Sequence, residues 1–212
     1  MEKTLDSLSW RYAVKKFSPE RVVSEAKITL LGAAFNLTAT SYGLQPIRLL
    51  IVRNQALQDQ LVSTSYGQRQ VADASHLLVL CIEKSIDRDY IESYFERVHQ
   101  VRGTSQEILR PFREGLLESF SEKTPEEIRN WAVNQAYLAM GNLLTVCAVE
   151  RIDSCPMEGF DPAALSEILD LSEKNLEPVL LLPVGYRSET DMFSEFKKVR
   201  KDETETVIYY KE

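Results

Sequence analysis

The 212-residue sequence has little cysteine and histidine, and it lacks the common motifs of nucleotide and hydrolase sites. The three cysteines, Cys81, Cys147 and Cys155, form no CxxC pair, which argues against a disulfide framework or thiolate zinc site and fits a reducing cytosol. The two histidines, His76 and His99, give little support to a Ser-His-Asp triad or a histidine-rich metal site. Neither GxGxxG, GxxxxGK[ST] nor GxSxG is present. We therefore expect neither a metal site nor a catalytic triad.

Long apolar runs and an excess of positive charge are also missing. The longest nearly apolar stretch, residues 136–149, spans 14 residues and is interrupted by Gly141, Asn142 and Thr145. A membrane span needs about 18 or more. The first residues, Met-Glu-Lys-Thr-Leu-Asp, lack the apolar core of a signal peptide. With 25 Lys and Arg against 32 Asp and Glu, the net charge is -7. We therefore expect a cytoplasmic protein with no nucleic-acid or membrane partner.

The composition is that of an ordinary globular chain, with 44% apolar, 9% aromatic and 27% charged residues. A chain of this length buries roughly 70% of its unfolded surface, enough for a substantial core. No repeat, low-complexity segment or Gly/Ser linker marks a boundary. The sequence therefore predicts one domain, residues 1–212, with a helical excursion at about 88–123 over the active site and a C-terminal dimerisation extension at about 201–212.

Apolar patterning predicts an α+β fold. Nearly continuous apolar runs indicate strands buried on both faces, at residues 49–52, 77–82 and 179–184. The spacing of apolar and polar residues predicts helices at about 3–9, 23–35, 55–63, 88–101 and 105–120. Another helix is expected to begin near Asp161. Together these elements predict a four- or five-stranded mixed sheet wrapped by helices.

The strongest helix signal begins at Thr124-Pro125-Glu126-Glu127. Thr124 and Glu127 can form a capping box, and Pro125 suits the first helical position. The helix is expected to reach Glu150 and to be apolar on nearly all sides from Ala136 onward. Both faces must then be covered, one by its own sheet, and another subunit is one candidate for the other. Residues 205–210 read as a terminal strand that needs a sheet edge, and a partner subunit's sheet is one candidate.

Two basic clusters lie at opposite ends of this acidic chain. Arg11 and Lys15 are four residues apart and would face the same way on a helical turn. Lys198 and Arg200 share a face if residues 197–201 are extended. Each cluster alone is typical of a solvated surface. If the fold brings them together, they form a phosphate clamp in which Arg supplies a two-pronged fork and Lys a point charge.

Five short motifs, in order, resemble those of the FMN-dependent nitroreductase family, in particular its NAD(P)H nitroreductase and dihydropteridine reductase branch. The resemblance rests on Arg11-Tyr12-Ala13-Val14-Lys15-Lys16-Phe17, Thr40-Ser41-Tyr42-Gly43-Leu44-Gln45-Pro46, Asp73-Ala74-Ser75-His76, Pro156-Met157-Glu158-Gly159-Phe160 and Lys198-Val199-Arg200. The sequence departs from the family pattern at three positions. Ala13 stands where the family commonly has Ser, Gly43 where it commonly has Asn, and Gly67 where it often has Asn.

The resemblance implies a nitroreductase-like α+β fold with a four- to five-stranded, mostly antiparallel mixed sheet, a C-terminal strand exchanged with the partner subunit, and an FMN site at a homodimer interface. Arg11, Lys15, Lys198 and Arg200 would hold the phosphate and ribityl chain, and Lys15 or Lys198 could also lie near N1 and C2=O. The Glu158 N–H would reach flavin N5, and Thr40, Ser41 and Gly43 would come from the opposite subunit. The full set of implied cofactor-binding residues is Arg11, Tyr12, Ala13, Lys15, Thr40, Ser41, Gly43, Gln68, Gln70, Pro156, Met157, Glu158, Gly159, Lys198 and Arg200. The implied substrate channel is lined by Tyr42, Tyr66, Phe112 and Phe120.

The implied activity is that of an NAD(P)H-dependent oxidoreductase. NADH or NADPH would pass hydride to FMN N5 and be replaced by a small planar acceptor such as a nitroaromatic, quinone or pteridine. No catalytic side chain is expected, because the cofactor supplies the chemistry. The alternatives are a flavin-binding redox or storage module without turnover and a dehalogenase-type member of the same fold.

Overall fold

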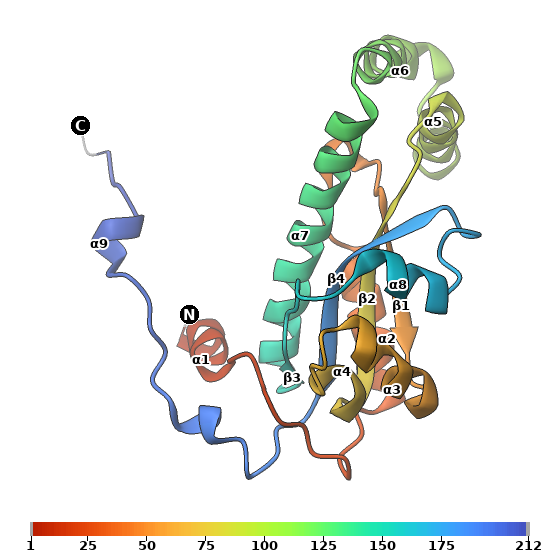
Figure 1. Ribbon diagram of the computed structural model, residues 1–212. Helices are drawn as coiled ribbons and strands as arrows, with labels where there is room; N and C mark the ends of the chain where they lie inside the picture. Colours follow the sequence, from red (N-terminus) through yellow and green to blue (C-terminus); the bar gives the residue numbers. More distant parts are fainter. Residues whose placement is uncertain (1, 211–212) are drawn as a thin grey trace.

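The computed structural model describes residues 2–210, and a four-stranded antiparallel sheet lies at its centre (Figure 1). The strands are β1 (Ile47–Val52), β2 (His76–Glu83), β3 (Asp153–Ser154) and β4 (Leu176–Gly185), in the spatial order β1-β2-β4-β3. Leu49 of β1 is opposite Leu80 of β2, and Leu78 of β2 is opposite Leu182 of β4. The α+β class is confirmed; the two-residue strand β3 was not predicted.

The core lies on both faces of this sheet because alternate residues of β2 point to opposite sides. Leu78, Leu80 and Ile82 pack with α2 (Glu25–Asn36) and α7 (Pro125–Val149). Leu77, Val79 and Cys81 pack against a layer formed by α3 (Gln55–Thr64), α4 (Gln70–Asp73) and α8 (Pro162–Ile168). All eight residues of β2 are buried, which confirms the prediction for this strand.

Helix α7 begins as predicted. Thr124 Oγ1 accepts a hydrogen bond from the Glu127 amide, and the Glu127 carboxylate accepts one from the Thr124 amide. Within residues 2–210, α7 is the one helix long and apolar enough, by length and composition alone, to cross a membrane. It packs against α2, β2 and β4 as a central core helix. Its other face leaves Tyr137, Leu138 and Val149 exposed in the single chain.

Helices α5 (Arg88–Arg102) and α6 (Gln106–Ser121) form a hairpin at one end of the molecule (Figure 1). Asp87 and Ser105 cap their N-termini, and Gly103 ends α5 in the left-handed conformation at φ +68°. The hairpin has a small core of its own, which includes Ile91 and Phe95. This hairpin coincides with the excursion expected at 88–123.

Helix α1 (Glu2–Trp10) and a C-terminal arm, residues 191–210, lie on the side of α7 that is away from the α5–α6 hairpin, and they diverge from one another (Figure 1). Helix α1 packs on α7, and the arm extends away from the sheet (Figure 1). The arm contains η2 (Met192–Glu195) and α9 (Glu203–Thr206).

The predicted strand at 205–210 is wrong for its first residues, which belong to α9. Asp202 and Glu205 form a capping box that initiates a helical turn. Within the part of the chain that the structure describes, residues 207–210 pair with no strand. Pairing of these residues with the sheet of a partner subunit stays a prediction.

Candidate functional site

The structure brings together the two basic clusters that are 187 residues apart in the chain. Lys198 Nζ donates a hydrogen bond to the backbone oxygen of Arg11. Arg11, Lys15, Lys198 and Arg200 all line one cleft of about 410 Å³ between residues 9–15 and the arm. The cleft also contains Tyr12 and Ala13 of the predicted set. The predicted juxtaposition of the two clusters is therefore present in the folded chain.

The charges of this cleft are uncompensated. Among the described residues, Arg11, Lys15, Lys198 and Arg200 form no ion pair with a carboxylate. Burial and the nearby Arg200 lower the pKa of Arg11, and burial together with Arg11 and Arg200 lowers the pKa of Lys198. Arg11 Nε is buried and has no hydrogen-bond partner. A bound anion would satisfy this donor and relieve the repulsion, so the cleft has the chemistry of a phosphate site.

An extended segment positions Arg11 and Lys15. Val14 and Phe17 are buried on the side of the sheet that α3, α4 and α8 cover. Ala13 forms a β-bridge to Ser154, and Phe17 forms one to Arg187. Val14 is fully buried, whereas Lys15 lies at a bend of this segment, is exposed and lines the cleft. The Lys15 ammonium lies 4.0 Å from Cys155 Sγ, next to the second predicted site segment. Burial raises the pKa of the Cys155 thiol, so Cys155 is a structural thiol beside the cleft.

That second segment, residues 156–159, is a turn on the side of the sheet that α3, α4 and α8 cover. Met157 forms a bridge to Leu181 of β4, and Gln68 Nε2 donates to Gly159 O at 2.8 Å. The Glu158 carboxylate accepts a hydrogen bond from Tyr137 of α7 at 2.9 Å. Within residues 2–210, the Glu158 and Gly159 amides donate to no acceptor. These two amides are therefore available to a ligand. Pro156 belongs to the same turn, whereas Gln70 lies on α4.

The predicted residues Thr40, Ser41 and Gly43 lie elsewhere. They form η1 (Ser41–Gly43) and its N-cap, and the Ser41 amide donates to Gln135 Oε1 of α7 at 2.8 Å. Arg11 lies beside Cys147, near the other end of α7. The twelve residues from 135 to 147 correspond to about 18 Å along the helix axis. A single chain does not bring η1 and the cationic cleft together.

The residues predicted to line a channel are also dispersed. Phe120 is only 5% exposed and makes an edge contact with Trp131 at 5.2 Å between ring centroids. Tyr42 lies next to Phe120, with 6.2 Å between centroids. Phe112, on α6, packs against Phe95 and is 51% exposed. Tyr66 is exposed and donates to the backbone oxygen of Phe160. Phe120 is therefore a core residue of the hairpin, and the other three aromatic rings are accessible.

Two of the departures from the expected motifs have a backbone explanation. Gly43 and Gly67 both have φ +76°, and each follows a tyrosine that is also at positive φ. A Cβ atom at Gly43 would lie 2.7 Å from the Tyr94 hydroxyl, whereas one at Gly67 would meet nothing. Tyr94 therefore occupies the space that an Asn side chain would need at position 43.

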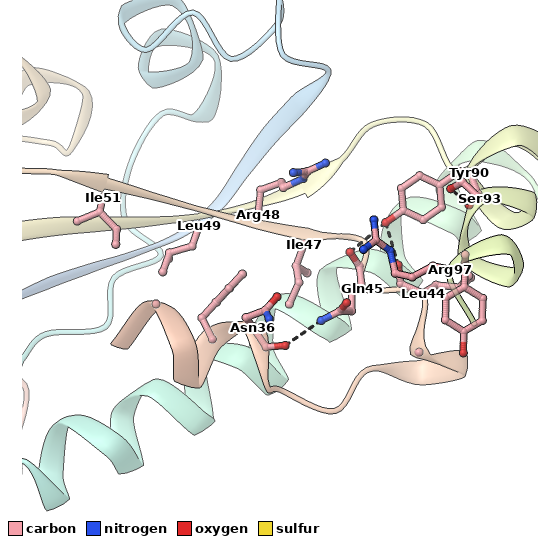
Figure 2. Close-up of a pocket in the computed structure, with 14 residues that line it drawn as sticks. Asn36, Leu44, Gln45, Ile47, Arg48, Leu49, Ile51, Tyr90, Ser93 and Arg97 are labelled. Carbon is pink, nitrogen blue, oxygen red and sulfur yellow. Dashed lines mark hydrogen bonds between the residues drawn. The ribbon is translucent and has the colours of Figure 1, made fainter. Parts of the chain in front are cut away.

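A larger cleft, of about 680 Å³, was not predicted (Figure 2). It lies between α2, the edge strand β1 and α5, and Tyr90 spans it by donating to the backbone oxygens of Leu44 and Gln45. Arg48 and Arg97 line it beside half-exposed residues of β1. No periodicity in the sequence could reveal it, because it arises from the sheet order that leaves β1 at an edge.

The sequence model of the Nitroreductase family matches residues 8–186. The chain belongs to this family. A Staphylococcus saprophyticus protein, assigned by name to the NAD(P)H nitroreductases, is 29% identical over 95% of this chain and 96% of its own length.

Solved structures confirm the nitroreductase-like fold. A Bacillus subtilis protein assigned by name to the nitroreductases has a TM-score of 0.88 at 18% identity, covering 99% of this chain and 100% of its own. A second protein assigned by name to the nitroreductases, from Exiguobacterium sibiricum, was crystallised with FMN. It has a TM-score of 0.80 at 15% identity, covering 98% of this chain and 97% of its own. The predicted family is confirmed, and these relatives support the predicted oxidoreductase class and its cofactors.

The family match ends before the C-terminal arm. The assignment of Lys198 and Arg200 therefore depends on the geometry of the cleft described above. The sequence missed the residues that hold the arm in place, among them Asp191 and Arg187. Neither stands in a motif that sequence reasoning could have singled out.

Proposed function

We propose that this nitroreductase is an FMN-dependent NAD(P)H oxidoreductase that acts as a homodimer and reduces planar, electron-poor acceptors such as nitroaromatics or quinones. The observation that carries the proposal is the cleft between residues 9–15 and the arm. It gathers Arg11, Lys15, Lys198 and Arg200 without a carboxylate partner among the described residues, and Arg11 Nε is buried there without an acceptor.

The residues of the cleft and the adjacent turn suit the parts of FMN. Arg11 and Arg200 would bind the phosphate through their guanidinium groups, with Lys198 as a point charge. Lys15 lines the cleft, and its ammonium lies beside Cys155, which precedes the turn at residues 156–159. It would place positive charge near N1 and C2=O of the flavin. The free amides of Glu158 and Gly159 would face the ring, and Gln68 holds this turn in place.

When bound, FMN supplies the acceptance and donation of hydride at N5. The chain itself then needs no general acid or base, which agrees with the sparse histidine of the sequence. Its tasks are to bind the phosphate, orient the ring and admit NAD(P)H and the acceptor in turn. Tyr42, Tyr66 and Phe112 are the accessible aromatic residues that would contact these planar molecules.

Three observations support the homodimer. Thr40, Ser41 and Gly43 lie too far along α7 to reach the cationic cleft of their own chain, so they would contribute to the cleft of a second copy. The exposed face of α7 presents Leu138 and Val149 to a partner. The arm carries exposed apolar residues, Ile208 and Tyr210 among them, that a partner's β1 edge and its neighbouring cleft could cover.

The proposal is tested with the purified full chain. FMN is titrated into the protein, and NADH or NADPH oxidation is then followed with menadione or nitrofurazone as the acceptor. We expect saturable FMN binding and acceptor-dependent turnover. Failure to bind flavin overturns the proposal entirely. Tight binding without turnover overturns the enzymatic part and leaves the flavin-storage alternative.

A further inference from the structure

Asp191, the first residue of the C-terminal arm, is buried with 1% of its surface exposed. Its Oδ2 atom accepts hydrogen bonds from the Lys15 amide at 2.8 Å, the Lys16 amide at 3.2 Å and the Tyr12 hydroxyl at 3.0 Å. Its Oδ1 atom accepts from the Phe193 amide at 3.2 Å, where it caps η2. A single carboxylate therefore binds the N-terminal segment with one oxygen and the arm with the other.

These contacts lie between the two halves of the phosphate site. Lys15, whose amide Asp191 accepts, belongs to the same extended segment as Arg11. The Phe193 amide donates to Asp191 Oδ1, and Phe193 begins the part of the arm that leads to Lys198 and Arg200. The arm beyond it is largely exposed, so few packing contacts could place it without this anchor.

A neighbouring ion pair strengthens the same junction. Arg187 donates to the buried Asp153 carboxylate through its backbone amide and guanidinium, and its guanidinium lies 4.3 Å from the Trp10 ring centroid. The Tyr12 ring lies on the same guanidinium at 4.6 Å while its hydroxyl donates to Asp191. The end of α1, the extended segment and the start of the arm thus share one network.

We propose that Asp191 is a positioning residue that assembles the phosphate clamp, so that it sets the preference of the protein for a phosphorylated flavin over the same flavin without its phosphate. This inference rests on the proposed function, because it assigns Asp191 a role toward the FMN phosphate. Asp191 does not touch that anion; it acts through the backbone of Lys15 and Phe193.

The charge of Asp191 is compatible with this role. Burial raises its pKa, but the hydrogen bonds from Lys15, Lys16, Phe193 and Tyr12 outweigh burial and hold the pKa below its ordinary value. The carboxylate therefore stays ionised at neutral pH. Its charge is directed to backbone amides and a hydroxyl, and it forms no ion pair with the clamp cations. The clamp keeps its net positive charge.

The test compares FMN with riboflavin, which lacks the phosphate. Dissociation constants for both are measured by flavin fluorescence for the wild type, Asp191→Ala and Asp191→Asn. Asn keeps the size of the side chain but replaces one of the two carboxylate oxygens by an NH₂ group. That group cannot accept from the backbone amides, so the hydrogen bonds on one side of the side chain are lost. We expect both variants to weaken FMN binding about tenfold or more, the scale of a displaced charge-assisted contact, and to change riboflavin binding by less than about threefold.

Asp202→Asn is the matched control, because Asp202 is an exposed aspartate of the same arm that caps α9. It removes the same charge without touching Lys15 or Phe193, and it should leave the ratio of the two dissociation constants unchanged. Circular dichroism establishes that each variant is folded. A merely structural role would weaken both flavins equally.

An unchanged ratio, or an equal loss for both flavins, in a folded Asp191→Asn protein overturns the inference. This result is distinct from failure of the proposed function, in which the wild type itself binds neither flavin.

Discussion

The Lys198 ammonium donates a hydrogen bond to the backbone oxygen of Arg11, and this contact joins the C-terminal arm to the start of the extended segment. The first cluster lies on the segment that follows α1, and the second belongs to an exposed arm. Their contact turns two surface charge runs of an acidic protein into one cleft of positive charge.

Arg11→Ala and Arg200→Ala should each weaken FMN binding by about 1.5–3 kcal/mol, the usual scale for a hydrogen bond to a charged group. Arg11 would lose a buried donor, and Arg200 a guanidinium that faces the same anion. Fluorescence titration with FMN measures the change. Arg110→Ala, on the exposed side of α6, is the control and should bind FMN like the wild type. Unchanged affinity in both clamp variants would remove these residues from the site.

FMN affinity should fall at alkaline pH because of Lys198. Burial, Arg11 and Arg200 lower its pKa from the ordinary 10.5, so the free protein loses this charge at a lower pH than an ordinary lysine does. The contribution of Lys198 to binding is therefore complete below the lowered pKa and is lost as pH rises through it. Titrations between about pH 7 and pH 10.5 should show a steeper loss in the wild type than in Lys198→Met. Identical profiles for the two proteins would contradict this assignment.

Stability should fall on mild acidification because of His76 in β2. This side chain is 1% exposed, and burial, followed by the charge of Arg53, lowers its pKa from the ordinary 6.5. Near pH 6.5, His76 therefore takes up a proton in the unfolded chain but stays neutral in the folded chain. Stability is complete above that pH and is lost as pH falls from there toward the lowered pKa. Urea unfolding at pH 7 and pH 5 measures the loss.

His76→Gln should reduce the difference in unfolding free energy between those two pH values. His99→Gln, on helix α5, is the control and should leave the difference close to that of the wild type. The same pH dependence in His76→Gln as in the wild type would show that another group is responsible.

Gly43→Ala should destabilise the protein by about 1 kcal/mol or more, and by more than Gly67→Ala. Both glycines have φ +76°, so both substitutions incur the same backbone strain. Only at position 43 would the new Cβ also meet a neighbour, the Tyr94 hydroxyl at 2.7 Å. Thermal unfolding compares the two variants. Adding Tyr94→Phe should recover part of the loss in Gly43→Ala and none in Gly67→Ala; equal losses at both positions would exclude the steric explanation.

Local signals predicted the parts of the fold that depend on local chemistry. The apolar runs of β1, β2 and β4 and the capping box at Thr124 act over a few residues, so the sequence indicates them directly. Strand β3 has only two residues, which is too short to leave a periodic pattern. The terminal strand was misjudged at Glu205 because pairing depends on an edge outside the segment, whereas the Asp202 cap acts within it.

Charge spacing and motif resemblance indicated the two basic clusters that meet in the cleft, since each cluster lies within a few residues. Their role toward a flavin phosphate stays a prediction. Asp191 was not found because its role depends on contacts with Lys15 and Lys16, more than 170 positions away in the chain. The separation of Ser41 from Arg11 along α7 likewise follows only from the folded chain.

The most direct test of the account is the ratio of the riboflavin and FMN dissociation constants for the wild-type protein at neutral pH. The two flavins share the ring and the ribityl chain and differ in the phosphate that the clamp would bind. We predict that FMN binds at least about tenfold more tightly, equivalent to about 1.4 kcal/mol or more. Equal affinities for the two flavins, or no binding of either, would contradict the assignment of Arg11, Lys15, Lys198 and Arg200 to a flavin phosphate site.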